Sequence, residues 1–160
     1  MLSKKCQYAI HALLYITEKG NSDRLTIHEI AERKNIPRKF LEAILVDLKI
    51  GGIVESKKGK FGGYYLKRKP EDVNILEVIR LVDGAVALLP CVSLNFYESC
   101  GRCDDEKTCN INKLFSAVRD ETLKILSATT LADLQNQQFA KVLRTKTLKG
   151  EENKLIKAMR

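Results

Sequence analysis

The sequence predicts a mainly α-helical protein with one small β-hairpin, and three observations lead to this fold class. Apolar residues recur at helical spacing in several segments, most clearly over 40–48 and 111–127. Two short strand-like runs, 53–56 and 64–66, lie on either side of a glycine-rich loop. The 160 residues are 44% apolar and 30% charged, so the chain can bury a core, and no apolar run approaches the roughly 20 residues of a membrane-spanning helix.

The first two helices have recognisable ends. Ser3 is suited to cap a helix that Gly20 and the polar residues after it terminate. Thr26 and Glu29 have the spacing of a capping box, which predicts a second, short helix ending near Lys34. The apolar face expected for the first helix consists of Cys6, Ile10, Leu13, Leu14 and Thr17.

A third helix leads into the hairpin. Pro37 suits the first turn of a helix, where its missing N–H costs nothing, and the glycine pair at 51–52 ends that helix. Two helices joined by a tight turn and followed by a β-hairpin describe a winged helix-turn-helix, in which the second helix enters the DNA major groove and the hairpin, or wing, lies along the backbone or minor groove. The expected apolar stripe of the third helix is Phe40, Leu41, Ile44, Leu45 and Leu48.

The rest of the chain changes character several times. Asn74 and Glu77 predict the capped start of a buried helix that is apolar on nearly all sides. A long helix is expected further on, with a stripe that needs a partner helix, and Thr130 begins one more capped turn. The expected divisions are a winged head (1–70), a linker and buried helix (71–89), a cysteine-rich loop (90–110), the long helix and capped turn (111–135) and a basic tail (136–160).

Charge is unevenly distributed along the chain, whose formal net charge is +8. Residues 1–70 hold 15 Lys or Arg against 7 Asp or Glu, whereas residues 71–140 hold 6 against 11. A basic first half beside an acidic middle is typical of a head that binds a polyanion, because phosphate contacts are made chiefly by Lys and Arg. A basic surface that only faces water is the alternative.

Two groups of basic residues are the main candidates for contact with double-stranded DNA. Arg38 and Lys39 lie at the start of the third helix, where unpaired N–H groups and the helix dipole also attract phosphate; either side chain could instead read guanine. Lysines crowd the wing loop, where cationic tips favour phosphates or a narrow minor groove. The wing candidates are Lys57, Lys58 and Lys60, and further candidates for positioning the DNA backbone are Ser3, Lys4, Tyr8 and Thr26.

Nothing in the sequence indicates an enzyme. It has no phosphate-binding loop, no dinucleotide-binding glycine pattern and no nucleophile elbow. The two histidines, His11 and His28, are expected to have structural or solvent-exposed roles. The N-terminus lacks the apolar core of a secretory signal, so we expect a cytoplasmic protein that does not bind membranes.

Four of the five cysteines lie within nineteen residues, in the segment that lacks periodicity. Four thiolates in one loop, including a Cys-x-x-Cys pair, could converge on one zinc ion or one iron–sulfur cluster, since both favour soft ligands. The thiols could equally hold no metal and form disulfides on oxidation. The candidate ligands are Cys91, Cys100, Cys103 and Cys109, whereas Cys6 is expected to be buried in the core.

Three segments together resemble a known family. They are Ile36-Pro37-Arg38-Lys39-Phe40-Leu41-Glu42, the Gly-x-x-Gly-Gly-Tyr wing over 59–64, and the closing Thr-Leu-Ala-Asp-Leu over 130–134. Over residues 1 to about 135 the chain resembles the Rrf-two (Rrf2) family of winged-helix transcription regulators, to which IscR and NsrR belong. The resemblance implies a transcription regulator that is a homodimer, with the long helix packed against its twin and two heads on successive half-sites.

The resemblance also implies a ligand set. Cluster-binding family members use three cysteines before the long helix, and Cys91, Cys103 and Cys109 match those places. Where the family offers a histidine or an acidic fourth ligand, this chain has Asn112 and Gln7, which are poor ligands, so Cys100 is the simplest fourth ligand. Many family members with imperfect cysteine sets hold no cluster. Two other classes of function are a zinc-stabilised protein-interaction module and a small electron carrier, the latter leaving the winged head unexplained.

Overall fold

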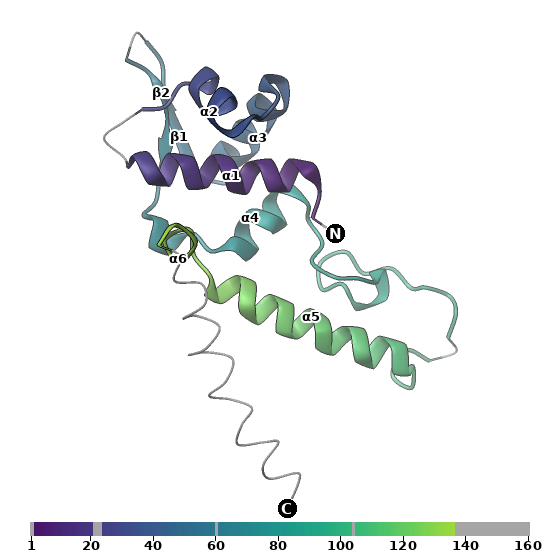
Figure 1. The fold of residues 1–160 in the computed structure, drawn as a ribbon. Helices are drawn as coiled ribbons and strands as arrows, with labels where there is room; N and C mark the ends of the chain where they lie inside the picture. Colours follow the sequence, from purple (N-terminus) through teal and green to yellow (C-terminus); the bar gives the residue numbers. More distant parts are fainter. Residues whose placement is uncertain (1, 21–23, 60, 104, 137–160) are drawn as a thin grey trace, which may run out of the picture.

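The computed structural model describes residues 2–20, 24–59, 61–103 and 105–136. Three helices and a hairpin form the head, a short helix follows, and one long helix runs along the opposite side of the molecule (Figure 1). The order of elements is α1 (Lys4–Lys19), α2 (Ile27–Lys34), α3 (Arg38–Ile50), β1 (Val54–Lys57), β2 (Gly63–Leu66), a 3₁₀ turn (Pro70–Asp72), α4 (Ile75–Val82), a second 3₁₀ turn (Pro90–Val92), α5 (Asn110–Ala128) and α6 (Leu131–Gln135).

The starts of α1 and α2 agree with the predicted caps. The Ser3 hydroxyl accepts a hydrogen bond from the Cys6 N–H, and the Thr26 hydroxyl accepts one from the Glu29 N–H. The Glu29 carboxylate accepts a hydrogen bond from the Tyr15 hydroxyl at 3.0 Å. This residue therefore ties α2 to α1, a role that the capping-box pattern did not predict.

Helix α1 is central to the core and packs against α2, α3, α4 and α6. Because it has neighbours on several sides, its buried face is wider than the expected stripe: Ile10 and Leu14 are only half-buried, while Ala9, Ala12 and Ile16 are fully buried. Cys6 is fully buried, as predicted. The largest buried side chains around α1 are Leu13, Ile16, Ile30, Leu41, Ile44, Leu45, Leu48, Ile53 and Val78.

The predicted stripe of α3 is right except at its first member. Phe40 is 54% exposed and its ring contacts the Tyr8 ring edge-on, with centroids 6.4 Å apart. It lies in the first turn of α3, where its ring meets only the edge of α1 at Tyr8, whereas the other four members of the stripe are fully buried. The expectation that Phe40 is a core residue was therefore wrong.

The wing is an antiparallel hairpin in which Val54 pairs with Leu66 and Lys57 with Gly63. It is joined to the head by a short bridge, because the Leu25 N–H donates to the Tyr64 carbonyl at 3.1 Å and the Tyr64 N–H donates back at 2.8 Å. A Cβ at Gly63 would lie 2.7 Å from the Leu25 carbonyl oxygen, so glycine permits this close approach.

Helix α5 has no buried residue, and several of its apolar side chains are exposed: Ile111 (62%), Leu114 (60%) and Val118 (38%). Its C-terminal part meets the head, where Leu126 packs against the core. Two interactions hold the C-terminal end of α5. Thr130 and Asp133 form a complete capping box at α6, and Asn74 forms a β-bridge with Thr130.

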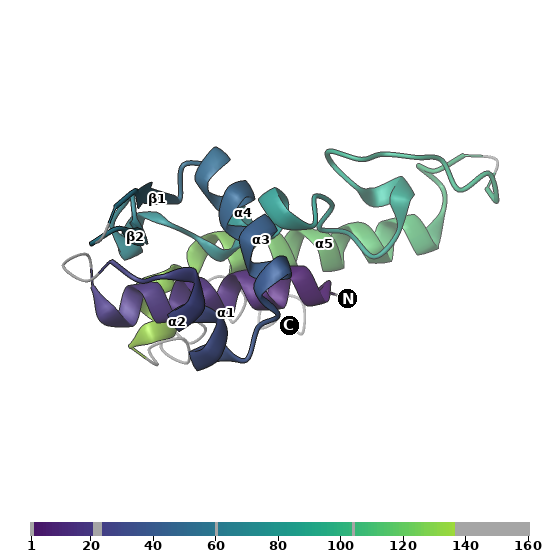
Figure 2. The ribbon, with the colours of Figure 1, turned by 90° about the horizontal axis from the view of Figure 1, so that it is seen from above.

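The wing and the cysteine-rich loop lie at opposite ends of the molecule (Figures 1 and 2). Figure 2 shows the loop beyond the N-terminal end of α1, beside the first turns of α5. No helix in the described part of the chain is long and apolar enough to cross a membrane. The basic tail from residue 137 onward, which was expected to have little pattern, lies outside the described residues.

Candidate DNA-binding surface and cysteine-rich loop

The first candidate surface is the start of α3. Arg38 and Lys39 are both exposed there, and the cap residue Pro37 supplies no side-chain hydrogen bond to the helix end. Arg38 Nε lies 3.1 Å from Glu42 Oε1, so this guanidinium is partly neutralised within its own helix. Lys39 has no acidic partner among the described residues, so its charge is not offset within the helix.

Helix α1 packs against α3 and supports this surface. Lys5 Nζ lies 2.6 Å from Asp47 Oδ2, which ties the start of α1 to α3. Tyr8 is half-buried and contacts Phe40, so it positions the first turn of α3 in addition to any contact of its own with DNA. Lys4 is exposed at the start of α1.

Ser3 is occupied by contacts within the protein. Its hydroxyl donates to Asp83 Oδ1 at 2.5 Å while accepting from the Cys6 N–H, and its backbone N–H donates to Asp83 Oδ2 at 2.9 Å. Thr26 is exposed, and its hydroxyl caps α2. Both residues therefore have a structural role as helix caps.

The second candidate surface is the wing. Lys57 and Lys58 are exposed, whereas Lys60 lies outside the described residues. Arg24, which sequence reasoning missed, adds a cation beside them, with its guanidinium 5.9 Å from the Tyr65 ring centroid. Arg24 is next to Leu25, which pairs with Tyr64 of the wing strand, and this pairing is what would have identified Arg24.

The cysteine-rich loop brings its thiols close enough to shift one another's pKa values, Cys91 with Cys100, Cys100 with Cys103, and Cys103 with Cys109. Cys91 is buried in the 3₁₀ turn and Cys100 is exposed. The Cys109 sulfur caps α5 by accepting from the Asn112 N–H at 3.5 Å. Chemically, four thiols suit zinc or an iron–sulfur cluster, but no three His, Cys, Asp or Glu side chains within the described ranges are arranged to hold one ion.

The loop gives its thiols different acidities. A hydrogen bond from the Arg102 N–H holds the pKa of Cys100 below the ordinary value for a thiol, and the thiols of Cys103 and Cys91 act in the same direction. Burial, followed by the neighbouring thiols Cys100 and Cys109, raises the pKa of Cys103 to about 11. Burial also raises the pKa of Cys91. Because the thiolate is the reactive form, these pKa shifts favour reaction at Cys100 over Cys91 and Cys103.

Comparison with known proteins decides the family. The model of the Rrf2 family, described as an iron-dependent transcriptional regulator, matches residues 2–137. The chain belongs to the Rrf2 family. It is 42% identical over 137 residues to an rrf2-like HTH-type transcriptional regulator of Rhodobacter capsulatus, covering 84% of this chain and 91% of that one.

Two other Rrf2-family proteins are more distant. The transcriptional regulator IscR of Escherichia coli O1:K1 is 28% identical over 137 residues, which cover 86% of this chain and 81% of that protein. The structure of CymR, the global cysteine regulator of Bacillus subtilis, superposes with a TM-score of 0.71 at 24% identity, over 86% of this chain and 97% of that one. This last likeness shows the winged-helix fold. The protein is therefore a DNA-binding transcriptional regulator of the Rrf2 family and not an enzyme, as the sequence predicted.

In this Rrf2-family protein, side chains of α5 bind the turn that carries Cys91. Asn112 Nδ2 donates to the Cys91 carbonyl oxygen at 3.3 Å, and Arg119 Nη1 donates to the Val92 carbonyl oxygen. The Arg119 side chain is only 15% exposed. The resemblance marked Asn112 as a poor metal ligand; the fold uses its amide as a hydrogen-bond donor and acceptor instead.

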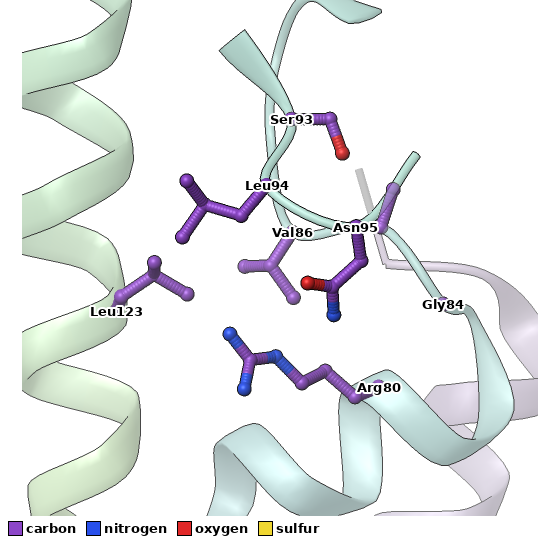
Figure 3. Close-up of a pocket in the computed structure, with 8 residues that line it drawn as sticks. Arg80, Gly84, Val86, Ser93, Leu94, Asn95 and Leu123 are labelled. Carbon is purple, nitrogen blue, oxygen red and sulfur yellow. The ribbon is translucent and has the colours of Figure 1, made fainter. Parts of the chain in front are cut away.

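A small pocket lies where α4, the loop and α5 meet (Figure 3). The Arg80 side chain extends from α4 into the pocket toward Leu123 of α5, and Leu94 and Asn95 of the loop lie across from it (Figure 3). The start of the loop is thus in contact with both the buried helix and the long helix, the two elements that connect it to the head.

Proposed function

We propose that this Rrf2-family regulator binds double-stranded DNA as a homodimer, and that the thiols of its cysteine-rich loop control its affinity for DNA. The observation that carries the proposal is α5, a helix of 19 residues with no buried side chain and an exposed apolar stripe. A second copy of the chain would cover that stripe, because the matching helix of the partner is equally apolar.

In this proposal, the head (residues 1–70) contacts DNA through α3 and the wing. Arg38 and Lys39 would enter or flank the major groove, while Lys57, Lys58 and Lys60 would bind the backbone or minor groove. Lys4, Tyr8 and Thr26 would position the backbone, whereas Ser3, whose hydroxyl and N–H donate to Asp83, would act by capping α1. The buried helix (71–89) and the dimerisation helix with its capped turn (111–135) would connect the two heads, and the tail (136–160) would add positive charge.

The loop (90–110) would be the sensor. Cys91, Cys103, Cys109 and Cys100 would hold an iron–sulfur cluster or zinc once the loop closed around it, or would act without metal through oxidation of their thiols. A cluster would supply one-electron redox chemistry. In either case the loop would act through its contacts with α4 and α5, and only a difference in DNA affinity between two states of the loop would amount to regulation.

The test uses full-length protein purified without oxygen, assayed for iron, zinc and visible absorption. A duplex selected by this protein from a random-sequence pool is then titrated by fluorescence anisotropy, before and after mild oxidation. We expect the affinity to change at least several-fold on oxidation or metal loss, and the change to disappear when Cys91, Cys103 and Cys109 are replaced by Ser. Equal affinity in both states would overturn the sensor, and selection of no duplex would overturn the DNA-binding assignment.

A further inference from the structure

We infer that Phe61, at the tip of the wing and backed by Arg24, is an apolar wedge that enters the minor groove of bound DNA. The inference rests on the proposed placement of the head on DNA and adds a residue that reads DNA shape. It assigns a role to a side chain that the basic-residue argument did not use.

Among the described residues, Phe61 is the most exposed large apolar side chain, at 81%. It stands between Gly59 and Gly62 in a loop whose other described members include the exposed Lys57 and Lys58. A Cβ at Gly62 would lie 2.2 Å from the Lys57 carbonyl oxygen, so this tight turn of the loop has no room for a side chain at that position. An aromatic ring is thus presented to solvent at a narrow tip among positive charges.

The backbone beneath this ring is held in place. Arg24 Nη1 donates to the Phe61 carbonyl oxygen at 3.5 Å, and the Arg24 guanidinium also lies 5.9 Å from the Tyr65 ring centroid. The next residue, Leu25, is hydrogen-bonded in both directions to Tyr64. The segment before α2 therefore buttresses the wing and places a guanidinium beside the base of Phe61.

This combination fits the minor groove better than it fits an apolar partner. The side chains around Phe61 are cationic, and a narrow minor groove concentrates negative potential, which attracts Arg and Lys. Phenylalanine has no donor or acceptor for reading base edges. Its means of contact is to wedge between base pairs, partly unstack them and bend the duplex, as apolar wedges do in other minor-groove binders.

The first experiment exploits a property of the sequence, which contains no tryptophan. Phe61→Trp makes the wedge the sole tryptophan, whose emission can be excited apart from that of the five tyrosines. Phe96→Trp, at another exposed aromatic position but on the loop at the far end, is the matched control. On addition of the selected duplex we expect the emission of Phe61→Trp to be quenched by stacking, and that of Phe96→Trp to be unchanged.

The second experiment separates the effect of the Phe61 ring from the effect of the positive charges on the wing. We expect Phe61→Ala to weaken binding several-fold and to reduce the bend of the duplex, measured by energy transfer between its ends, without changing the slope of log affinity against log salt. Lys58→Ala should reduce that slope by about two for a dimer and leave the bend intact. Wild-type affinity and bend in Phe61→Ala, or unquenched Phe61→Trp, would overturn the inference. Failure of the wild-type protein to bind any duplex would instead overturn the proposed function.

Discussion

Arg119 of α5 donates a hydrogen bond to the carbonyl oxygen of Val92, 27 residues earlier in the chain. The bond joins the middle of the long helix to the turn that carries Cys91. Together with the Asn112 amide, it fixes the buried end of the cysteine-rich loop to α5 through side-chain hydrogen bonds to the backbone of the turn. A change in the loop that displaces this turn must therefore break the bond or move α5.

Removal of that bond should loosen the turn. In Arg119→Ala we expect amide hydrogen exchange at Val92 and Ser93 to become about tenfold faster, since one hydrogen bond to a charged group stabilises by roughly 1.5–3 kcal/mol. The control is Asp120→Asn, which weakens the neighbouring ion pair of Arg119 but keeps its bond to Val92. Equal exchange in Arg119→Ala and Asp120→Asn would show that packing alone holds the turn.

The exposed stripe of α5 should control assembly. Replacing Leu114 and Val118 by Asp puts charge on a surface that is solvent-exposed in the single chain, so the fold should persist while the mass in sedimentation equilibrium falls to that of one 18.1 kDa chain. Binding to the selected duplex should weaken at least tenfold, because one head loses the avidity of two. Lys113→Asp, on the same helix, should remain dimeric. A dimer that survives the Leu114 and Val118 changes would place the interface elsewhere.

The start of α3 should contribute to electrostatic binding to DNA. Lys39→Ala is expected to lower the slope of log affinity against log salt by about two for a dimer, one contact per head. Arg38→Ala should change the slope less, because Glu42 already neutralises that guanidinium in part. If Arg38 reads a base, its loss should cost about 1–3 kcal/mol at one position of each half-site. The control is Lys113→Ala in α5, which lies across α1 from α3. An unaltered slope in Lys39→Ala would refute the assignment.

The fourth cysteine can be tested apart from the other three. If the loop holds a cluster or zinc, Cys91→Ser, Cys103→Ser and Cys109→Ser should each lower the iron or zinc content and any visible absorption. Cys100→Ser should do the same if its thiol is the fourth ligand. Cys6→Ala, in the core, should keep the wild-type metal content. Protein that carries neither iron nor zinc leaves thiol oxidation, and Cys100, with its lowered pKa, should then be the first thiol alkylated by iodoacetamide.

Stability should decline at alkaline pH through Cys6. Burial, assisted by the negative charge of Asp83, raises the pKa of this thiol from 9.0 to about 11. A group whose pKa is higher in the folded state contributes stability below its unfolded pKa and loses that contribution as pH rises. The free energy of unfolding in urea should therefore fall between about pH 9 and pH 11, and fall less steeply in Cys6→Ala. Parallel pH profiles would mean that the thiol does not titrate in this range.

Local pattern was sufficient for most of the fold, because caps and helical spacing are encoded within a few residues. Ser3, Thr26, Asn74 and Thr130 all cap the helices predicted from them. The exposure of Phe40 could not be read from its spacing, since it depends on where α3 first meets α1.

The candidate sites depended more on contacts between distant segments. Arg24 joins the wing only because Leu25 pairs with Tyr64, a pairing across nearly forty residues. The links from Asn112 and Arg119 to the turn at Cys91 are likewise long-range. The sequence therefore predicted which residue types could contact DNA or metal, but not the contacts that connect those residues to the rest of the protein.

The bridge between Asn74 and Thr130 holds the C-terminal end of α5, which makes that end a fulcrum and the helix a lever. With 19 residues at about 1.5 Å per residue, the lever arm is roughly 28 Å long. A rotation of about 5° at the fulcrum would move the cysteine end by roughly 2.5 Å over that arm, about half the rise of one helical turn. Conversely, if the loop displaces the cysteine end of α5 by that distance, α5 rotates by only a few degrees about its other end, beside α4.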